Sequence, residues 1–231
     1  MLQALRNEVY EANLELVRRG LVIYTFGNAS AIWREKGLIV IKPSGVPYEK
    51  MTPEDMVVTD LDGRVVEGNL RPSSDMATHA LLYREFPAIG GVVHTHSRHA
   101  TAWAQALRGI PCFGTTHADY FHGPVPVTAH LTRDEIETEY EGNTGVAIVR
   151  AMEGRDPLVC PAVLAAGHAP FCWGKTVSAA AHNAVVLEEV AAMAWQTITI
   201  NPNAKPLPEA QRDKHYFRKH GSKATYGQGN C

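Results

Sequence analysis

The sequence predicts a layered α/β protein with a mixed or antiparallel sheet. Short apolar runs typical of strands are interspersed with helical patterns, but without the strict strand–helix–strand rhythm of a parallel sheet. With 231 residues, 45% of them hydrophobic, the chain is long enough to bury a core without disulfide or metal staples. It contains no internal repeat and no low-complexity block, and we expect a single domain, 1–231.

The N-terminal part predicts one helix and then a series of short strands. Apolar residues at three- and four-residue spacing indicate an amphipathic helix from residue 2, which ends at the basic pair before Gly20. A Pro-containing stretch at 52–55 predicts a short helical turn, and the Asp–Gly pair at 62–63 predicts a hairpin. Strand-like runs are found at 21–25, 31–33, 38–41, 56–59 and 64–67.

The remainder of the chain predicts more helix than strand. Ser74 or Asp75 caps a helix that runs to about residue 86, and Thr132 caps another, with Glu135 in the capping-box position. We expect strands at 91–96, 162–166 and 171–173. Further helices are expected at 97–107, 176–199 and 209–220, the last after a Pro-rich connector.

Charge and apolar patterning exclude several classes of function. A net charge of -2 argues against a nucleic-acid binder that relies on a basic patch. The longest apolar segment, 179–200, is interrupted by two glutamates and predicts a buried helix, not a membrane span. The chain begins without the apolar stretch of a signal peptide, and its cysteines form no CxxC pair, so we expect a cytoplasmic protein. The cysteines are Cys112, Cys160, Cys172 and Cys231.

Histidine is the residue type that points to a metal. His94 and His96 end a predicted strand, where residues two apart project on the same face and their imidazoles can bind one ion. Alone, the pair fits a polar strand end more often than a metal site. His168 lies among small residues at a second strand end, and Asp75 stands at a helix start. A core histidine and a plain N-cap are their ordinary alternatives, but together the four would form an open catalytic metal site.

Small polar loops follow three of the strand-like runs. Each offers hydroxyls and unpaired backbone N–H groups, and one of them carries a lysine, which together suit a phosphate dianion. Three ordinary turns are the alternative, and no Walker or dinucleotide fingerprint is present. Asp119 and Tyr226 are further candidates for proton transfer, whereas the basic segment 214–220 also fits a solvated helix. The loop residues are Gly27, Asn28, Lys42, Ser44, Gly45, Ser73 and Ser74.

Taken together, these segments resemble the class II aldolase/epimerase family, from residue 11 to residue 228. The motifs that carry the resemblance are FGNAS at 26–30, IKPSGV at 41–46, PSSD at 72–75, GVVHTHS at 91–97, GTTHADY at 114–120, DKH at 213–215, RKHG at 218–221 and YGQ at 226–228. The resemblance implies a three-layer α/β/α fold with a central mixed, largely antiparallel sheet. Two positions depart from the family pattern, Ala169 after the third histidine and Thr225 before the closing tyrosine.

The resemblance also implies the roles of the candidate residues. It implies one Zn²⁺ per subunit, or another divalent transition metal, held by Asp75, His94, His96 and His168. It implies sugar-phosphate contacts from the loop residues named above and acid/base roles for Asp119 and Tyr226. Glu141, His215 and Arg218 match positions near the site. The family forms homotetramers with sites between subunits, so the tail 221–231 would contribute to a site, with Tyr226 reaching an adjacent chain.

The activity implied by the resemblance is that of an isomerase in pentose phosphate metabolism, in the catabolism of arabinose, ascorbate or another pentose. It would interconvert L-ribulose 5-phosphate and D-xylulose 5-phosphate by retro-aldol cleavage of C3–C4 and re-addition. A zinc aldolase that cleaves a ketose 1-phosphate to dihydroxyacetone phosphate and an aldehyde is the nearest alternative. Relatives with that activity tend to carry Glu at the position of Asp75, which favours the epimerase. A non-catalytic scaffold and a zinc hydrolase are weaker alternatives. No nucleic-acid or membrane partner is expected.

Overall fold

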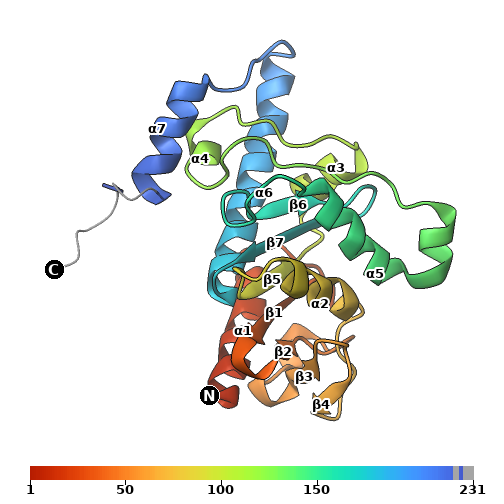
Figure 1. Ribbon diagram of the computed structural model, residues 1–231. Helices are drawn as coiled ribbons and strands as arrows, with labels where there is room; N and C mark the ends of the chain where they lie inside the picture. The colour runs from red at the N-terminus through yellow and green to blue at the C-terminus, as the bar shows by residue number, and fades with distance from the viewer. Residues whose placement is uncertain (221–223, 226–231) are drawn as a thin grey trace.

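A seven-stranded sheet divides the molecule into three layers (Figure 1), in the computed structural model that describes residues 1–220, 224 and 225. The strands are β1 (Asn28–Trp33), β2 (Leu38–Ile41), β3 (Val57–Asp60), β4 (Val65–Glu67), β5 (Gly91–His94), β6 (Ala162–Leu164) and β7 (Pro170–Gly174). The helices are α1 (Leu2–Arg18), α2 (Met76–Glu85), α3 (Arg98–Gln105), α4 (Thr115–Ala118), α5 (Arg133–Ala151), α6 (Val177–Ile200) and α7 (Glu209–His220). Short 3₁₀ helices are η1 (Arg34–Lys36), η2 (Tyr48–Lys50) and η3 (Pro53–Asp55).

The strand order is β4-β3-β2-β1-β5-β7-β6, and each pairing between neighbouring strands is antiparallel. Parallel pairing is confined to an isolated bridge between Val127 and Leu164 in the described part of the chain. The predicted three-layer α/β/α class is therefore confirmed, with a sheet at the antiparallel end of the expected range.

Both faces of the central strands are buried, so a strand such as β2 is a continuous apolar run, whereas β4 at the edge of the sheet is exposed. In β2, Ile39 and Ile41 pack in the core that α2 and α5 cover. Val40, which points to the opposite face, packs in the core that α1, α3 and α6 cover. None of the helices in the described residues is both long and apolar enough to cross a membrane.

The structure corrects three of the predicted strands, one of which, 162–166, ends at Leu164. The run 21–25 has β-type composition but forms no strand, because it makes the turn that follows α1, and Tyr24 adopts a positive φ of 53°. The predicted strand 91–96 ends at His94, so His96 lies beyond the strand. The convergence of the His94 and His96 imidazoles therefore does not come from the two-residue period of a strand, because His96 lies in the segment after β5.

The central strands bring together residues far apart in the sequence. The register places Asn28 of β1 opposite His94 of β5, and His94 opposite Phe171 of β7. Directly before β1, Gly27 has a φ of 77°, and a Cβ there would lie 2.7 Å from Val22 Cγ1 and 3.0 Å from the carbonyl oxygen of His94. Only glycine allows the chain to pass this close to His94.

Candidate active site

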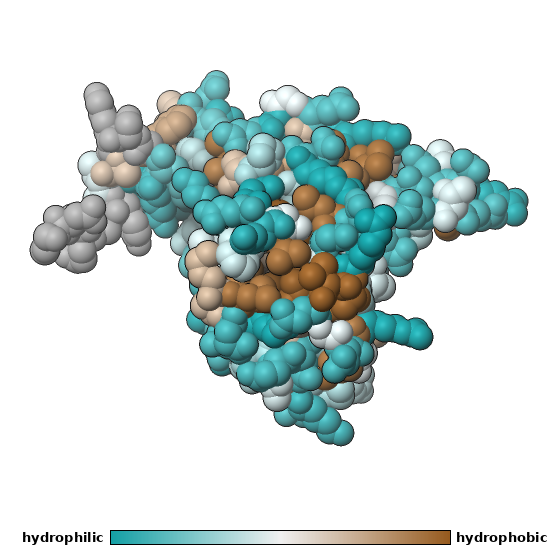
Figure 2. Space-filling view, turned by 60° about the horizontal axis from the view of Figure 1, so that its bottom comes forward, coloured by the Kyte–Doolittle hydropathy of each residue, from teal (hydrophilic) through white to brown (hydrophobic). Residues whose placement is uncertain are grey.

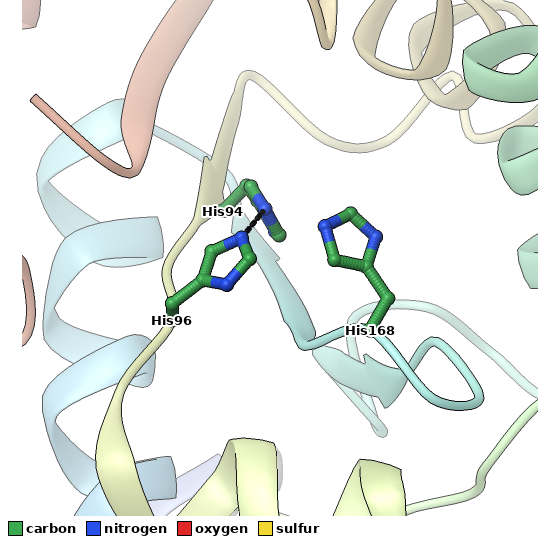
Figure 3. A group of neighbouring side chains, drawn as sticks. All are labelled: His94, His96 and His168. Atoms are coloured by element: carbon green, nitrogen blue, oxygen red, sulfur yellow. Dashed lines mark hydrogen bonds between the residues drawn. The ribbon is translucent and has the colours of Figure 1, made fainter.

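Three imidazoles converge at the end of the central strands (Figure 3). The ring centroids of His94, His96 and His168 form a nearly regular triangle, with separations of 4.9, 4.8 and 5.0 Å. One ring nitrogen from each residue can be chosen so that all three lie within 4.8 Å of one another. In the described part of the chain, this is the group of His, Cys, Asp or Glu side chains with the geometry to hold a metal ion.

The hydrogen bonds of His94 fix which nitrogen faces the centre of this triangle. Its Nδ1 lies 3.0 Å from the carbonyl oxygen of Pro170, which can only accept, so Nδ1 carries the proton and Nε2 presents a lone pair. Burial lowers the pKa of His94, His96 and His168, so their rings are neutral at physiological pH. Neutral imidazoles with inward lone pairs are the form that binds a transition metal.

The spacing of these nitrogens also fits a metal. Nε2 of His94 and Nε2 of His96 are 3.1 Å apart. Two nitrogens bound at about 2.0–2.1 Å to a tetrahedral ion would be roughly 3.3 Å apart. Nδ1 of His168 is buried without a hydrogen-bond partner among the described residues. The donor set thus fits a divalent transition metal.

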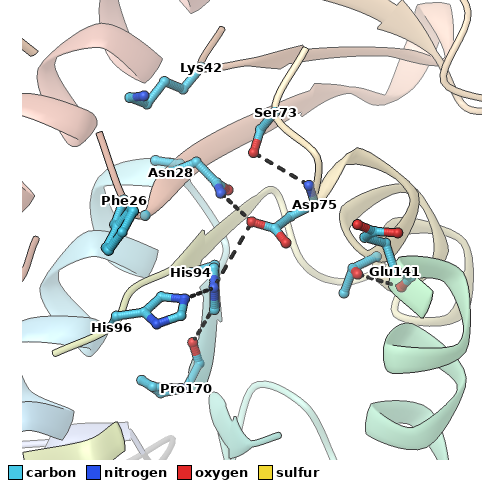
Figure 4. Close-up of polar contacts among 12 residues, drawn as sticks. Phe26, Asn28, Lys42, Ser73, Asp75, His94, His96, Glu141 and Pro170 are labelled. Atoms are coloured by element: carbon cyan, nitrogen blue, oxygen red, sulfur yellow. Dashed lines mark hydrogen bonds and ion pairs between the residues drawn. The ribbon is translucent and has the colours of Figure 1, made fainter. Parts of the chain in front are cut away.

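Asp75 lies beside the histidine triangle (Figure 4). Its Oδ2 is 4.0 Å from Nε2 of His94 and accepts a 2.6 Å hydrogen bond from Nδ2 of Asn28. Burial disfavours the charged carboxylate, but the nearby imidazoles of His94 and His79 and the hydrogen bond from Asn28 outweigh it and lower the pKa of Asp75. An ionised carboxylate therefore adds one negative charge beside the three neutral imidazoles, although its Oδ2 is turned toward Asn28.

The two polar loops at 42–45 and 71–74 are joined to each other. The backbone N–H of Ser73 donates to the carbonyl of Lys42 at 3.0 Å, and that of Ser44 donates to the carbonyl of Arg71 at 2.9 Å. The loop at Gly27 is held nearby, since the Tyr48 hydroxyl lies 2.9 Å from its carbonyl oxygen. Three segments that are separate in the sequence thus form one polar surface.

Lys42 is a buried cation on this surface. The residue is 2% exposed, and its Nζ donates to the carbonyls of Thr25 and Pro43 at 3.3 Å and lies 4.7 Å from the centre of the Tyr48 ring. Within the described residues no carboxylate forms an ion pair with Lys42. Burial lowers its pKa to about 8, so the amine is still protonated at neutral pH. A buried ammonium without a counter-ion is suited to bind an anion.

The loops and the histidines line a single cavity of about 390 Å³. Every predicted phosphate contact and every predicted metal ligand belongs to its wall. The structure therefore brings together in one cavity the two groups of residues, which lie in separate segments of the sequence. A larger groove of about 610 Å³ between α1 and α6 contains none of the predicted site residues.

A break in α5 provides the third wall of the cavity. Glu139 has non-helical angles (φ -148°, ψ 78°), and the next two residues, Tyr140 and Glu141, line the cavity. The break is held in place because the Thr78 hydroxyl, on α2, donates to the carbonyl of Glu141 and the Thr144 hydroxyl donates to that of Tyr140. Glu141, which the resemblance placed near the site, thus lines the cavity.

Asp119 does not line this cavity within one chain. It follows α4, which lies beside α7 at one end of the molecule (Figure 1). Arg218 of α7 donates to both carboxylate oxygens, at 3.1 and 2.9 Å, and His215 Nδ1 lies 3.1 Å from one of them. Burial raises the pKa of Asp119, but these hydrogen bonds outweigh it and hold the pKa below its usual value. Tyr226 and the segments 221–223 and 226–231 lie outside the described residues.

Thr25, Phe26, Pro43 and Tyr140 line the cavity but are not among the predicted site residues. Phe26 approaches the ring of His96, with 5.9 Å between centroids, and the ring of Tyr140 lies 6.1 Å from that of His168. Phe26 directly precedes the Gly–Asn loop, so the sequence could have indicated it as a site residue. The sequence could not have indicated Tyr140, because a helical pattern gives no sign of a break at Glu139.

The comparisons with known proteins agree with this geometry. The family model for the "Class II Aldolase and Adducin N-terminal domain" matches residues 7–195. L-ribulose-5-phosphate 4-epimerase UlaF of Salmonella paratyphi A and of Salmonella typhi are each 56% identical over 227 residues, 98% of this chain and 100% of theirs. A solved L-fuculose 1-phosphate aldolase superposes with a TM-score of 0.77 at 27% identity, over 92% of this chain and 94% of its own. An L-fuculose-1-phosphate aldolase from Thermus thermophilus superposes with a TM-score of 0.65 at 25% identity, over 88% and 98%. The chain therefore belongs to the family of class II aldolase and adducin N-terminal domains.

Proposed function

We propose that this protein is a metal-dependent L-ribulose-5-phosphate 4-epimerase, an isomerase that interconverts L-ribulose 5-phosphate and D-xylulose 5-phosphate. The observation that carries the proposal is the shared cavity, in which a three-histidine cluster faces polar loops with a buried, uncompensated lysine. The full-length similarity to the Salmonella epimerases supports the choice of substrate. The metal is zinc or another divalent transition metal, one per subunit, held by His94, His96 and His168 with Asp75 beside them.

The reaction requires a carbon–carbon bond to break. The proton on C4 of the 2-ketopentose is not acidified by the carbonyl at C2, so simple deprotonation cannot invert that centre. The C4 hydroxyl, however, is β to the carbonyl, so loss of its proton cleaves C3–C4 and releases glycolaldehyde phosphate beside the enediolate of dihydroxyacetone. When bound, the metal supplies a Lewis acid for the carbonyl oxygen, worth several kcal/mol of developing charge.

The residues of this chain hold the two fragments in place. Lys42, with the loops at Ser44–Gly45 and Ser73–Ser74, binds the phosphate of the aldehyde fragment, and this anchor keeps the fragment bound while its aldehyde group rotates. Re-addition to the opposite face of the aldehyde then gives the epimer. Inversion needs a proton acceptor on one face and a proton donor on the other, and Asp119 and Tyr226 are the proposed pair.

The separation of Asp119 from the cavity supports a site between subunits of a homotetramer. Asp119 is not in the wall of the cavity formed by its own chain, so a neighbouring copy would supply it. Figure 2 shows an apolar band across one face of the molecule. Separately, the exposed fractions of Trp195 and Ile200 on α6 are 53% and 84%. Exposed apolar surface of this kind is typical of subunit interfaces. Cys112, Cys160 and Cys172 are free and buried, which supports the cytoplasmic location we propose.

The intersubunit site can be tested by mixing two inactive variants. Asp119→Asn subunits keep the metal face, and His96→Asn subunits keep Asp119, so a random hybrid tetramer would contain complete sites at about a quarter of the positions. Unfolding and refolding the two variants together should recover activity that neither has alone. If the mixture stays inactive while wild type recovers under the same conditions, the site does not lie between subunits.

The reaction itself is tested by proton NMR. Purified protein is incubated with L-ribulose 5-phosphate, with and without a strong chelator, and the appearance of D-xylulose 5-phosphate is followed. We expect conversion that the chelator abolishes and added zinc restores. Conversion that persists in metal-free protein would refute metal dependence, and no conversion in metal-loaded protein would refute the epimerase.

An aldolase is the second candidate, and the superposition on L-fuculose 1-phosphate aldolase is the observation that favours it. The same cavity could hold a ketose 1-phosphate, with its phosphate on the loops and its carbonyl at the metal. The two activities differ in whether the aldehyde fragment leaves. The same NMR assay is run with a ketose 1-phosphate. Release of free aldehyde and dihydroxyacetone phosphate would show that the protein is an aldolase and would refute the epimerase.

A further inference from the structure

His96 is held less directly than its neighbour in the histidine triangle. His94 belongs to β5, between β1 and β7, and its ring is fixed by the carbonyl of Pro170. His96 lies two residues beyond the end of that strand. The described contacts of its ring are with the two other histidines and with Phe26. Its position therefore depends on what fixes the segment between β5 and α3.

The anchor of this segment lies on another helix. α3 begins at Arg98, and its N-cap residue, Ser97, makes no side-chain capping hydrogen bond. The first N–H groups of a helix need acceptors, and here Glu188 of α6 supplies them. Its carboxylate accepts from the backbone N–H of His99 at 2.9 and 3.1 Å and from that of Ala100 at 3.0 Å. It also accepts from Nδ1 of His99 at 2.7 Å.

This carboxylate is buried and tightly engaged. Its side chain is 14% exposed. Burial alone would raise the pKa of Glu188, but hydrogen bonds from Ala100, His99 and Ser97 outweigh it and hold the pKa below its usual value. The group is therefore ionised at neutral pH, at the positive end of the α3 dipole. Ser97 directly follows His96, so the hydrogen bond between Ser97 and Glu188 fixes the residue next to this histidine.

Glu188 is itself part of the frame that carries His94. α6 packs against β5 and β7, and a second contact ties it to α3, where Trp103 Nε1 donates to the carbonyl of Ala191 at 3.0 Å. One end of the 95–97 segment is thus fixed by the sheet and the other by α6. Replacing the Glu188 carboxylate by an amide would leave one acceptor oxygen where two now accept from the N–H groups of α3, and would turn an NH2 donor toward them.

We propose that Glu188 is a positioning residue for the metal centre, which holds His96 in the geometry that converges with His94 and His168 by capping α3 from α6. This inference rests on the proposed metal-dependent function and deepens it. Partners that orient metal ligands typically change metal affinity by 10–100-fold when they are mutated. Glu188 acts through the backbone next to the ligand and not through the imidazole, so we expect the lower end, about 10-fold.

The test compares Glu188→Gln with Glu189→Gln, a matched change of the adjacent glutamate, for which the structure records no hydrogen bond to α3 among the described residues. Metal-free protein is titrated with Co²⁺, and the visible absorption of the bound ion reports both its dissociation constant and its coordination geometry. We expect Glu188→Gln to weaken Co²⁺ binding about 10-fold and to change the spectrum, and Glu189→Gln to match wild type. Thermal unfolding of the metal-free proteins is measured in parallel.

Each outcome bears on the proposal. A Glu188→Gln protein with a lower unfolding temperature but wild-type Co²⁺ affinity and spectrum would make Glu188 merely structural and overturn the inference. If this variant does not fold, Glu188→Asp, which keeps the charge but retracts the carboxylate, is judged by the same two readouts. Failure of wild type to bind Co²⁺ would refute the proposed metal-dependent function instead, so the two failures are distinguishable.

Discussion

Replacing Lys42 by Met is the change that most directly tests the phosphate side of the cavity. The Lys42 ammonium is buried, with two carbonyls at 3.3 Å and the Tyr48 ring at 4.7 Å as its contacts. A phosphate in the cavity would give it a charge-assisted hydrogen bond, worth about 1.5–3 kcal/mol. Lys42→Met should therefore weaken phosphate binding by about 10- to 150-fold.

The assay is competitive inhibition by inorganic phosphate, which reports on the loops without requiring a chemical step. Lys50→Met, a change of an exposed lysine on η2, is the matched control and should leave the inhibition constant unchanged. A Lys42→Met protein whose inhibition constant stays within about threefold of wild type would refute the assignment of Lys42 to phosphate.

The pH dependence gives an independent check on the same residue. Burial lowers the pKa of Lys42 from 10.5 to about 8, so phosphate affinity in the wild type should fall as pH rises above 8 and the ammonium is lost. Between about pH 8 and 10.5 the unfolded state binds more protons at this site than the folded state, so its contribution to stability rises with pH. At neutral pH, burial of the charged Lys42 amine lowers the free energy of unfolding by roughly 3 kcal/mol. In Lys42→Met, both the pH dependence of phosphate affinity and this pH dependence of stability should disappear, and the free energy of unfolding at neutral pH should not fall.

Four further substitutions test the other parts of the proposed site. His96→Asn should lower metal content and turnover together. If the metal-free variant retains its turnover, His96 is not a ligand of a catalytic metal. Asp119→Asn and Tyr226→Phe should each lower turnover by about 10²–10⁴-fold with metal content unchanged. Wild-type turnover in both variants would refute the proposal that these two residues act as acid and base. Tyr140→Phe should lower kcat/KM by about 2- to 10-fold, the loss of one neutral hydrogen bond to substrate, and an unchanged kcat/KM would exclude that contact.

Local patterns in the sequence predicted most strands of the sheet, whereas the resemblance to a known family named the residues that the structure places around the cavity. Buried strands such as β2 are apolar throughout, and the loop residues follow such strands directly. Local patterns could not predict which segments, far apart in the sequence, contact each other in the fold. The hydrogen bond between Ser73 and Lys42 joins loops about 30 residues apart, and nothing in either loop indicates the other.

Where a prediction failed, tertiary contacts outweighed local preference. The run 21–25 has the composition of a strand, but the chain uses it to leave α1 and approach β1 through Gly27. The break in α5 is equally invisible in the sequence, since it depends on the Thr78 hydroxyl of α2. Tyr140 was missed for that reason, although its neighbour Glu141 was found through the family resemblance.

The electrostatics of Asp119 restrict how the proposed acid/base pair can work. Arg218 and His215 hold the pKa of Asp119 below its usual value, so at neutral pH this carboxylate is ionised and can accept a proton but has none to donate. A tyrosine hydroxyl, with an ordinary pKa near 10, is in the opposite state and can donate. The resting pair is therefore ready for the direction in which Asp119 takes the C4-hydroxyl proton and Tyr226 returns one to the re-added oxygen. The reverse direction needs Asp119 protonated and the tyrosine deprotonated, which are the states that a turnover in the first direction leaves behind.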